Sequence, residues 1–312
     1  MHPDSPLYIA GHQGLIGSAF TALMQARGHR NLILRRRAEL DLADPAAVER
    51  FFATTRPEYV LLAAGRTGGI IANRTYPADL MQENLAIQSN VIGAAHRHGV
   101  KRLIFFASSC MYPREAAQPM PETALYGGPL ESTSQAYAVA KLAGVELCLA
   151  LNRQHGETRF IPLIPNSVYG PRDNFDLDNS HVMAALIRRF TEAAATGADS
   201  VTLWGSGSPR REFVFSEDLA DACRALFAGQ VDTLSLPVNI GPGEDIAIRD
   251  LASMIAELSG FTGQIAWDTT KPDGTPRKLL DSANLANWGW RPETPLATGL
   301  EKTIQWYLQS VR

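Results

Sequence analysis

The chain has 312 residues, of which 45% are hydrophobic and 20% charged, and its formal net charge at pH 7 is −3. This size and composition are typical of a globular enzyme that buries a substantial core and needs no metal or disulfide to fold. The slightly acidic balance argues against nucleic acid or an anionic membrane as a partner. Three cysteines without a CxxC pair indicate neither a disulfide framework nor a zinc site, so we expect no bound metal.

The chain start lacks the basic-then-apolar pattern of a signal peptide. We find no apolar run that approaches the roughly 18 residues needed for a membrane helix. We therefore expect a cytoplasmic protein with free thiols and no membrane partner.

The first half of the chain alternates short apolar strands with amphipathic helices. Strands are predicted over 7–10, 31–34, 59–64, 102–107 and 159–164, and helices over 15–27, from 44–45 onward, 77–98 and 137–153. Buried strands that alternate with helices are typical of βαβ units on a parallel sheet. The pattern predicts an α/β fold of the Rossmann type, with a doubly wound parallel sheet.

The composition of the sequence changes after Pro165, where the predicted loops become longer and richer in Pro, Gly, Asp and Asn. We predict a Rossmann domain over residues 1–165, to which residues of about 212–242 return. Residues 166–312 would form mainly a smaller α/β substrate domain over the carboxyl edge of the sheet, where open α/β folds bind ligands.

A glycine-rich loop follows the first predicted strand directly. Gly11, Gly14 and Gly17 form a GxxGxxG pattern, and Leu15 and Ile16 open the next helix. Glycine permits a tight turn and a close approach to a pyrophosphate, and the helix N-terminus supplies amide donors. An ordinary glycine turn is the alternative, but the strand before and the helix after favour dinucleotide binding.

The end of the second predicted strand carries three arginines, Arg35, Arg36 and Arg37, with no acid before Glu39. A guanidinium suits the 2′-phosphate of NADP, whereas NAD-binding folds usually place an acid there. A solvated basic loop is the alternative, but the position favours NADP(H). We place four further residues at the cofactor: Asp41, Leu42, Ala63 and Ala64.

Tyr137 and Lys141 form a YxxxK pair on a predicted helix, one turn apart on the same face. The lysine cation is expected to lower the pKa of the tyrosine, making it a usable acid or base. Ser108 follows the fourth predicted strand, where its hydroxyl can hold a substrate carbonyl. The combination of GxxGxxG, serine and YxxxK resembles the extended short-chain dehydrogenase/reductase family, in which Ser-Tyr-Lys is the catalytic set.

A closer resemblance rests on longer motifs. Residues 108–113, 173–182, 186–190, 204–207, 211–213 and 271–281 resemble the GDP-L-fucose synthase family, the epimerase-reductases that act on GDP-4-keto-6-deoxymannose, and the likeness covers essentially the whole chain. It implies a GDP-sugar substrate and NADP(H), with Tyr137, Lys141 and His181 also beside the cofactor. A homodimer through a four-helix bundle, formed by the helices over 77–98 and 137–153, is common among similar proteins.

The resemblance also implies roles for individual residues. Cys110 and His181 would be the acid/base pair of epimerisation, and Ser108, Tyr137 and Lys141 the reduction set. The substrate-binding residues would be Arg211 at the diphosphate, with help from Arg188 or Arg189 and Lys278, together with Trp204 near the sugar nucleotide and Asp281. Taken alone, a free cysteine such as Cys110 is most often a small buried hydrophobe, and a histidine such as His181 is more often a surface or capping residue than a catalyst.

Three positions depart from the family pattern: Ser167 replaces an asparagine, Arg66 a lysine, and Gln13 a basic residue of the phosphate loop. These changes leave open a related GDP-sugar enzyme of the colitose or heptose type. A 4,6-dehydratase or simple 4-epimerase is disfavoured by the absence of an Asp-Glu pair at 109–110. A non-catalytic NADP-binding protein is disfavoured because Tyr137 and Lys141 are both present.

Overall fold

The computed structural model describes residues 1–177, 180–229 and 234–311. Its centre is a six-stranded sheet whose strand pairs are all parallel. The strands lie in the order β10 (Val238–Ile240), β5 (Phe160–Pro165), β4 (Arg102–Phe106), β3 (Tyr59–Leu62), β1 (Leu7–Ala10) and β2 (Leu32–Arg35). Because the chain runs from β1 outward to β2 and then to β3 on the other side of β1, the strand order reverses there, which opens a crevice at the carboxyl ends.

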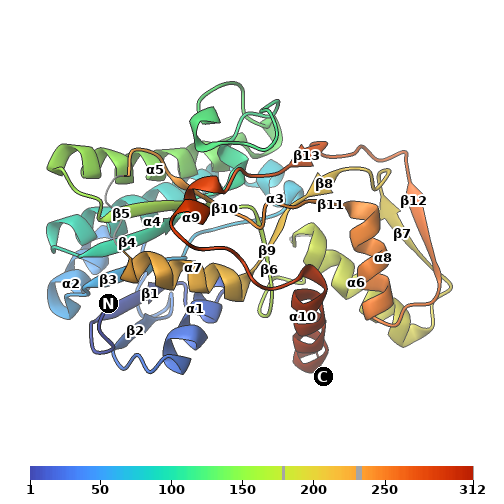
Figure 1. Ribbon diagram of the computed structural model, residues 1–312, viewed down its shortest axis with the longest axis horizontal. Helices are drawn as coiled ribbons and strands as arrows, with labels where there is room; N and C mark the ends of the chain where they lie inside the picture. The colour runs from blue at the N-terminus through green and yellow to red at the C-terminus, as the bar shows by residue number, and fades with distance from the viewer. Residues whose placement is uncertain (178–179, 230–233, 312) are drawn as a thin grey trace.

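Helices cover both faces of this sheet, as expected for a doubly wound fold (Figure 1). α1 (Leu15–Ala26) packs against α7 (Ser216–Ala228) on one face, and α2 (Pro45–Thr55), α4 (Pro77–Arg97) and α5 (Gln135–His155) form the other layer. The predicted start of α2 is confirmed: Asp44 caps the helix by accepting hydrogen bonds from the amides of Ala46 and Ala47. The predicted Rossmann-type architecture is therefore confirmed.

The observed elements differ from the predicted ones mainly at their ends. The helix predicted over 137–153 begins at Gln135 and ends at His155, where Gly156 takes a left-handed conformation with φ 63°. The strand predicted over 59–64 ends at Leu62. The short helix α3 (Ile70–Thr75) and the 3-10 turns η1 (Ser109–Met111), η2 (Glu122–Ala124) and η3 (Ser132–Ser134) were not predicted, because one turn has too few residues to show a hydrophobic period.

The second half of the chain builds three small sheets beside the central one. These are β6 (Ser167–Tyr169) with β9 (Phe213–Phe215), β7 (Ser200–Trp204) with β12 (Gln264–Asp268), and β8 (Arg210–Arg211) between β11 (Ile246–Ala247) and β13 (Arg277–Lys278). The helices of this part are α6 (Val182–Thr196), α8 (Ile248–Leu258), α9 (Ala283–Asn287) and α10 (Leu296–Ser310). A second apolar core, separate from that of the central sheet, lies among α6, α8 and α10.

Residues within the predicted return of 212–242 join the central sheet. β10 pairs with β5, and α7 packs on α1. Residues 230–233 of that stretch lie outside the described residues. The division of the chain into two domains near residue 165 stays a prediction.

One described helix is apolar and long enough to cross a membrane by length and composition alone. It spans Ser132–His155, with a mean hydropathy of 1.2 over 18 residues, so the sequence does contain a stretch that we did not expect. Within this helix Lys141 is buried against the sheet and Gly144 packs on the ring of Phe105. A core helix of a globular protein passes the same test, and the inner face of α5 is such a core face.

Candidate active site

The glycine loop predicted to hold a dinucleotide joins β1 to α1. Gly11 has φ +82°, and a Cβ there would lie 2.8 Å from the amide nitrogen of Ala64 on the neighbouring strand end. At Gly17 a Cβ would lie 2.2 Å from the carbonyl oxygen of Gly11. At Gly14 a Cβ would meet no atom closer than 3.6 Å. The protein itself therefore has room for a side chain at this position, and glycine keeps that space open. Leu15 and Ile16 then provide the first unpaired amides of α1, which favour an anion.

A recess of about 290 Å3 lies in the crevice between β1, β2 and β3. It is lined by nine of the predicted cofactor residues, Gly11, Gly14, Arg35, Arg36, Arg37, Asp41, Leu42, Ala63 and Ala64. The strand register explains why they meet, since Ala10 is opposite Arg35 on one side and Leu62 on the other.

The three arginines at the rim of this recess are held differently. The amide of Arg36 donates to Glu39 at 2.8 Å, and the Arg37 guanidinium donates to Glu83 at 2.8 Å. Arg35 lies over the ring of Phe51, 6.0 Å from its centroid. All three side chains are exposed, and a phosphate in the recess would replace the glutamates that now pair with Arg36 and Arg37. The glycine spacing, the open amides and the charge of these arginines fit a dinucleotide with a 2′-phosphate.

The predicted reduction residues come together at the carboxyl end of β4. Ser108 caps the η1 turn, where its Oγ accepts a hydrogen bond from the amide of Cys110 at 3.3 Å. Lys141, which is 5% exposed, donates from Nζ to the carbonyl of Phe106 at 2.9 Å and lies 5.9 Å from the ring centroid of Tyr137. Ser108, Cys110, Tyr137 and Lys141 therefore form one cluster around the start of α5.

The electrostatics of this cluster correct one expectation. Burial raises the pKa of Tyr137 far above its usual value, the neighbouring Cys110 raises it further, and a hydrogen bond with Ser108 lowers it. Burial also lowers the pKa of Lys141 to about 8. The expectation that the lysine lowers the tyrosine pKa was therefore wrong for the protein without its cofactor. Burial disfavours the charged phenolate of Tyr137, and it also disfavours the charged form of Lys141.

His181 lies close to Lys278, in a second group of cationic residues. It precedes α6 as its N-cap residue, and part of its surface is exposed while the rest is packed against neighbouring protein atoms. That burial lowers the pKa of His181, and the charge of Lys278 lowers it further. Arg211 is the register partner of Lys278 in the β8–β13 pair, so both cations share one ladder. Asn179, part of the motif before His181, lies outside the described residues.

The remaining predicted substrate residues are more dispersed. Arg188 donates to Glu192 at 2.8 Å and to the carbonyl of Phe175, whereas Arg189 is half-buried one position further along α6. Trp204 is 68% exposed at the end of β7, with Lys271 5.7 Å from its ring centroid. Asp281 lies one residue before Ser282, the N-cap of α9, and accepts a hydrogen bond from the amide of Ala283. The structure thus places Arg211 and Lys278 side by side on adjacent strands, whereas Arg188 is bonded to Glu192.

Several residues that the sequence reasoning did not select lie at this site. His12 and Gln13 line the cofactor recess, and the Nδ1 atom of His12 is buried without a partner among the described residues. Asn84 is 2% exposed, and a Cβ built at Gly65 would lie 2.8 Å from its Oδ1 atom and 3.5 Å from Nζ of Lys141. Asn84 lies in the middle of a predicted helix, where only its burial distinguishes it from a surface asparagine.

The sequence matches the NAD dependent epimerase/dehydratase family over residues 7–241. GDP-L-fucose synthase 1 of Arabidopsis thaliana is 52% identical over 99% of this chain and 94% of that protein. GDP-L-fucose synthase of Escherichia coli strain K12 is 46% identical over 97% of each chain. Among solved structures, a GDP-mannoheptose C4 reductase of Campylobacter jejuni, with NADP bound, superposes with a TM-score of 0.91 at 36% identity over 99% of each chain.

The fold and the Ser-Tyr-Lys cluster define an extended short-chain dehydrogenase/reductase, and this chain belongs to the NAD dependent epimerase/dehydratase family. Within that family it resembles the GDP-L-fucose synthases over nearly its whole length, as the motifs predicted.

Proposed function

We propose that this chain converts GDP-4-keto-6-deoxy-D-mannose to GDP-L-fucose, by inverting C3 and C5 and then reducing C4. The observation that carries the proposal is the placement of the Cys110 thiol beside Tyr137, Ser108 and Lys141 at one strand end. A reductase needs only the last three residues, so a thiol in their midst supports a second, proton-transfer reaction at the same carbonyl.

The cofactor would lie in the crevice between β1 and β3. Gly11, Gly14 and the start of α1 would hold the pyrophosphate, and the arginines from Arg35 to Arg37 would hold the 2′-phosphate of NADP(H). NADPH, when bound, supplies the hydride for C4. Two solved relatives support this choice, since a GDP-mannoheptose C4 reductase and a Naegleria fowleri GDP-L-fucose synthetase were solved with NADP.

The hydrogens at C3 and C5 of a 4-keto sugar are acidic because both carbons are alpha to the carbonyl. Cys110 and His181 would exchange these protons, one removing a proton from one face and the other delivering a proton to the opposite face. Ser108 and Tyr137 would donate hydrogen bonds to the enolate oxygen that forms at C4. After both inversions Tyr137, whose raised pKa keeps it protonated at neutral pH, donates its proton to the C4 oxygen during reduction.

The GDP moiety would be held by the second half of the chain. Arg211 and Lys278, paired on β8 and β13, would face the diphosphate, and Arg189, Trp204 and Asp281 would contact other parts of the sugar nucleotide. Arg188 would need to exchange its bond to Glu192 for one to a phosphate.

Consumption of NADPH at 340 nm with GDP-4-keto-6-deoxy-D-mannose, followed by NMR of the product, tests the proposal. We expect turnover that prefers NADPH over NADH and gives GDP-L-fucose. Turnover to an unepimerised product would remove Cys110 and His181 from their roles. If NADPH binds without turnover, a different GDP-sugar is the substrate, as the departures at Ser167 and Arg66 would then explain.

We also propose a cytoplasmic homodimer that pairs α4 and α5 of two copies in a four-helix bundle. Free Cys148 and Cys223, both buried, fit a reducing compartment. The outer face of α5 exposes the apolar side chains of Val139 and Ala143, which a second copy would cover. Light scattering should give twice the chain mass for the wild type and the mass of a single chain for Val139→Glu. Leu308→Glu, which changes an exposed leucine of α10, is the control and should remain dimeric. A monomeric wild type would contradict the proposal.

A further inference from the structure

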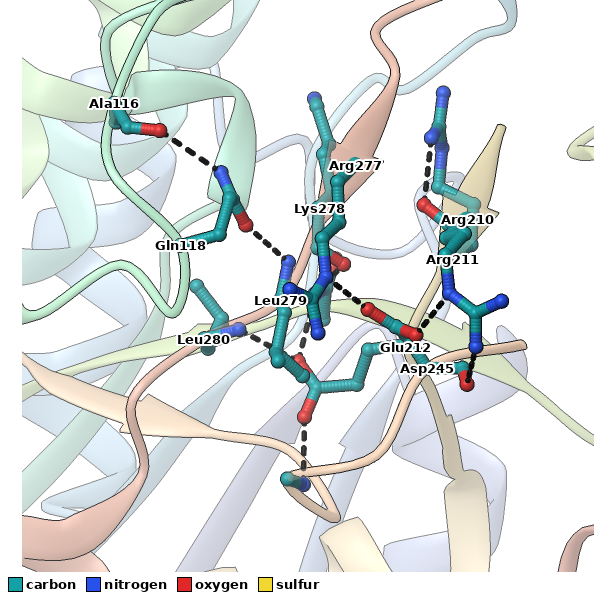
Figure 2. A network of polar contacts seen from close by, with 12 residues as sticks. Ala116, Gln118, Arg210, Arg211, Glu212, Asp245, Arg277, Lys278, Leu279 and Leu280 are labelled. Carbon is teal, nitrogen blue, oxygen red and sulfur yellow. Dashed lines mark hydrogen bonds and ion pairs between the residues drawn. The ribbon is translucent and has the colours of Figure 1, made fainter. Parts of the chain in front are cut away.

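A fully buried carboxylate, Glu212, directly follows Arg211 in the chain and is linked through Asn166 to Ser109 in the turn that carries Cys110. It is 0% exposed and accepts three hydrogen bonds (Figure 2). Its Oε2 atom accepts from Asn166 Nδ2 at 2.7 Å and from the amide of Leu280 at 3.0 Å, and its Oε1 atom accepts from the amide of Gly243 at 2.8 Å. The three donors come from the β5–β6 junction, the end of β13 and the loop after β10, so one side chain connects segments far apart in the sequence.

The space around this carboxylate is closed. A Cβ at Gly241 would lie 2.2 Å from Oε1 and 2.6 Å from Oε2 of Glu212, which leaves no room for any side chain there. Burial raises the pKa of Glu212 above its ordinary value, and the charge of Asp245 adds to this, while the three hydrogen bonds offset part of the rise. A buried acid is costly, and a hydrophobic residue would often stabilise such a position more. The carboxylate is therefore better explained by the geometry that it imposes than by stability.

The first geometry that it imposes is the pairing of β8 with β13. The Glu212 amide donates to the carbonyl of Lys278 at 3.3 Å, and Asn166 Nδ2 donates to the same carbonyl at 3.2 Å. Arg211 precedes Glu212 and is the register partner of Lys278. Figure 2 shows both cations on the adjacent strands beside the carboxylate. Holding Leu280 and Glu212 together therefore fixes Arg211 relative to Lys278.

The second geometry is the distance from this cation pair to the catalytic turn. Asn166, held by Glu212, accepts a hydrogen bond from Ser109 Oγ at 3.3 Å through its Oδ1 atom. Ser109 is buried and stands between Ser108 and Cys110 in the η1 turn. A continuous series of bonds thus joins the strands that carry the cations to the turn that carries the catalytic hydroxyl and thiol.

We propose that Glu212 is a positioning residue, which holds Arg211 and Lys278 in register for the substrate diphosphate and, through Asn166, sets their position relative to the Ser108–Cys110 turn. The inference rests on the proposed function, because it takes a GDP-sugar as the ligand. Glu212 touches no reacting atom; its effect passes through the backbone of its neighbours.

Calorimetric titration of GDP, guanosine and NADPH into wild type and Glu212→Gln tests the first part. The glutamine has the same shape, but its amide group presents N–H to at least one of the three donors. We expect GDP affinity to fall tenfold or more while guanosine and NADPH affinities stay within twofold. Glu244→Gln removes an exposed acid from the same region and should leave all three affinities unchanged.

Equal losses of affinity for GDP and guanosine, or no loss of GDP affinity, would overturn the inference. A general structural defect would weaken both ligands equally, because it does not act on the diphosphate that only GDP carries. A wild type that binds NADPH but not GDP would instead overturn the proposed function, and the inference with it. If Glu212→Gln does not fold, Gly241→Ala displaces the carboxylate without changing any charge and carries the same expectation.

Ser109→Ala tests the second part, because it cuts the bond to Asn166 and leaves the cation pair intact. We expect kcat to fall several-fold while GDP affinity and the KM for the GDP-sugar stay within twofold. An unchanged kcat would show that the series of bonds does not set the position of the catalytic turn.

Discussion

At the scale of single residues, Cys110 and Tyr137 should divide the two reactions between them. Cys110→Ser replaces a thiol by a hydroxyl, which is a much weaker acid and a poorer proton-transfer group, so epimerisation should fall by about 100-fold or more. Tyr137→Phe removes the proton donor for C4, so reduction should fall by a factor of about 100 to 10,000. Deuterium uptake at C3 and C5 from D2O reports the first reaction, and NADPH oxidation reports the second. Normal deuterium uptake by Cys110→Ser would contradict the role of the thiol.

A second prediction at this scale concerns Lys141, whose pKa burial lowers to about 8. The ammonium is charged below that pH, and the anionic cofactor favours its charged form. The Kd for NADPH should therefore rise as the pH increases from 7 to 9, and Lys141→Met should abolish most of this dependence. Fluorescence titration of NADPH at several pH values measures it. Parallel pH profiles for wild type and variant would show that another group controls binding.

At the scale of an element, the start of α1 separates two uses of glycine. Gly17→Ala would place a Cβ 2.2 Å from the Gly11 carbonyl oxygen, so α1 must move and stability should fall by about 1–3 kcal/mol, with loss of NADPH affinity. Gly14 has φ −78° and ψ 175°, which any residue adopts, so Gly14→Ala should weaken NADPH binding while stability changes little. Urea unfolding and NADPH titration of both variants check this. A destabilised Gly14→Ala would contradict the distinction.

At the scale of the whole molecule, the pH dependence of stability should carry a contribution from Asp173. Burial raises the pKa of this half-buried carboxyl to about 7, from about 3.8 in an exposed chain. Its contribution to the free energy of unfolding is present at low pH and is lost as the pH rises toward 7, by up to about 1.4 kcal/mol per pH unit. Asp173→Asn should therefore gain stability relative to wild type between pH 5 and 7.5. Urea unfolding across that window tests it, and a constant difference would contradict it.

The sequence by itself determined the Rossmann-type fold, the cofactor loop and the family. These features depend on short-range patterns: glycines spaced for one turn, apolar runs of strand length, and a tyrosine and lysine one helical turn apart. The resemblance then supplied the predicted roles of Cys110, His181 and Arg211, which the residues taken singly do not indicate.

Only the tertiary structure decided the electrostatics and the supports of the site. The pKa of Tyr137 moves opposite to the expected direction because burial, which the YxxxK spacing does not encode, outweighs the lysine. Glu212 meets Asn166 and Leu280 across 46 and 68 positions of the chain, respectively. Such contacts exist only once the small sheets of the second half close over the central sheet, so no local pattern in the sequence indicates them. The fold brings these distant segments together, and burial then shifts the pKa values of their ionisable side chains.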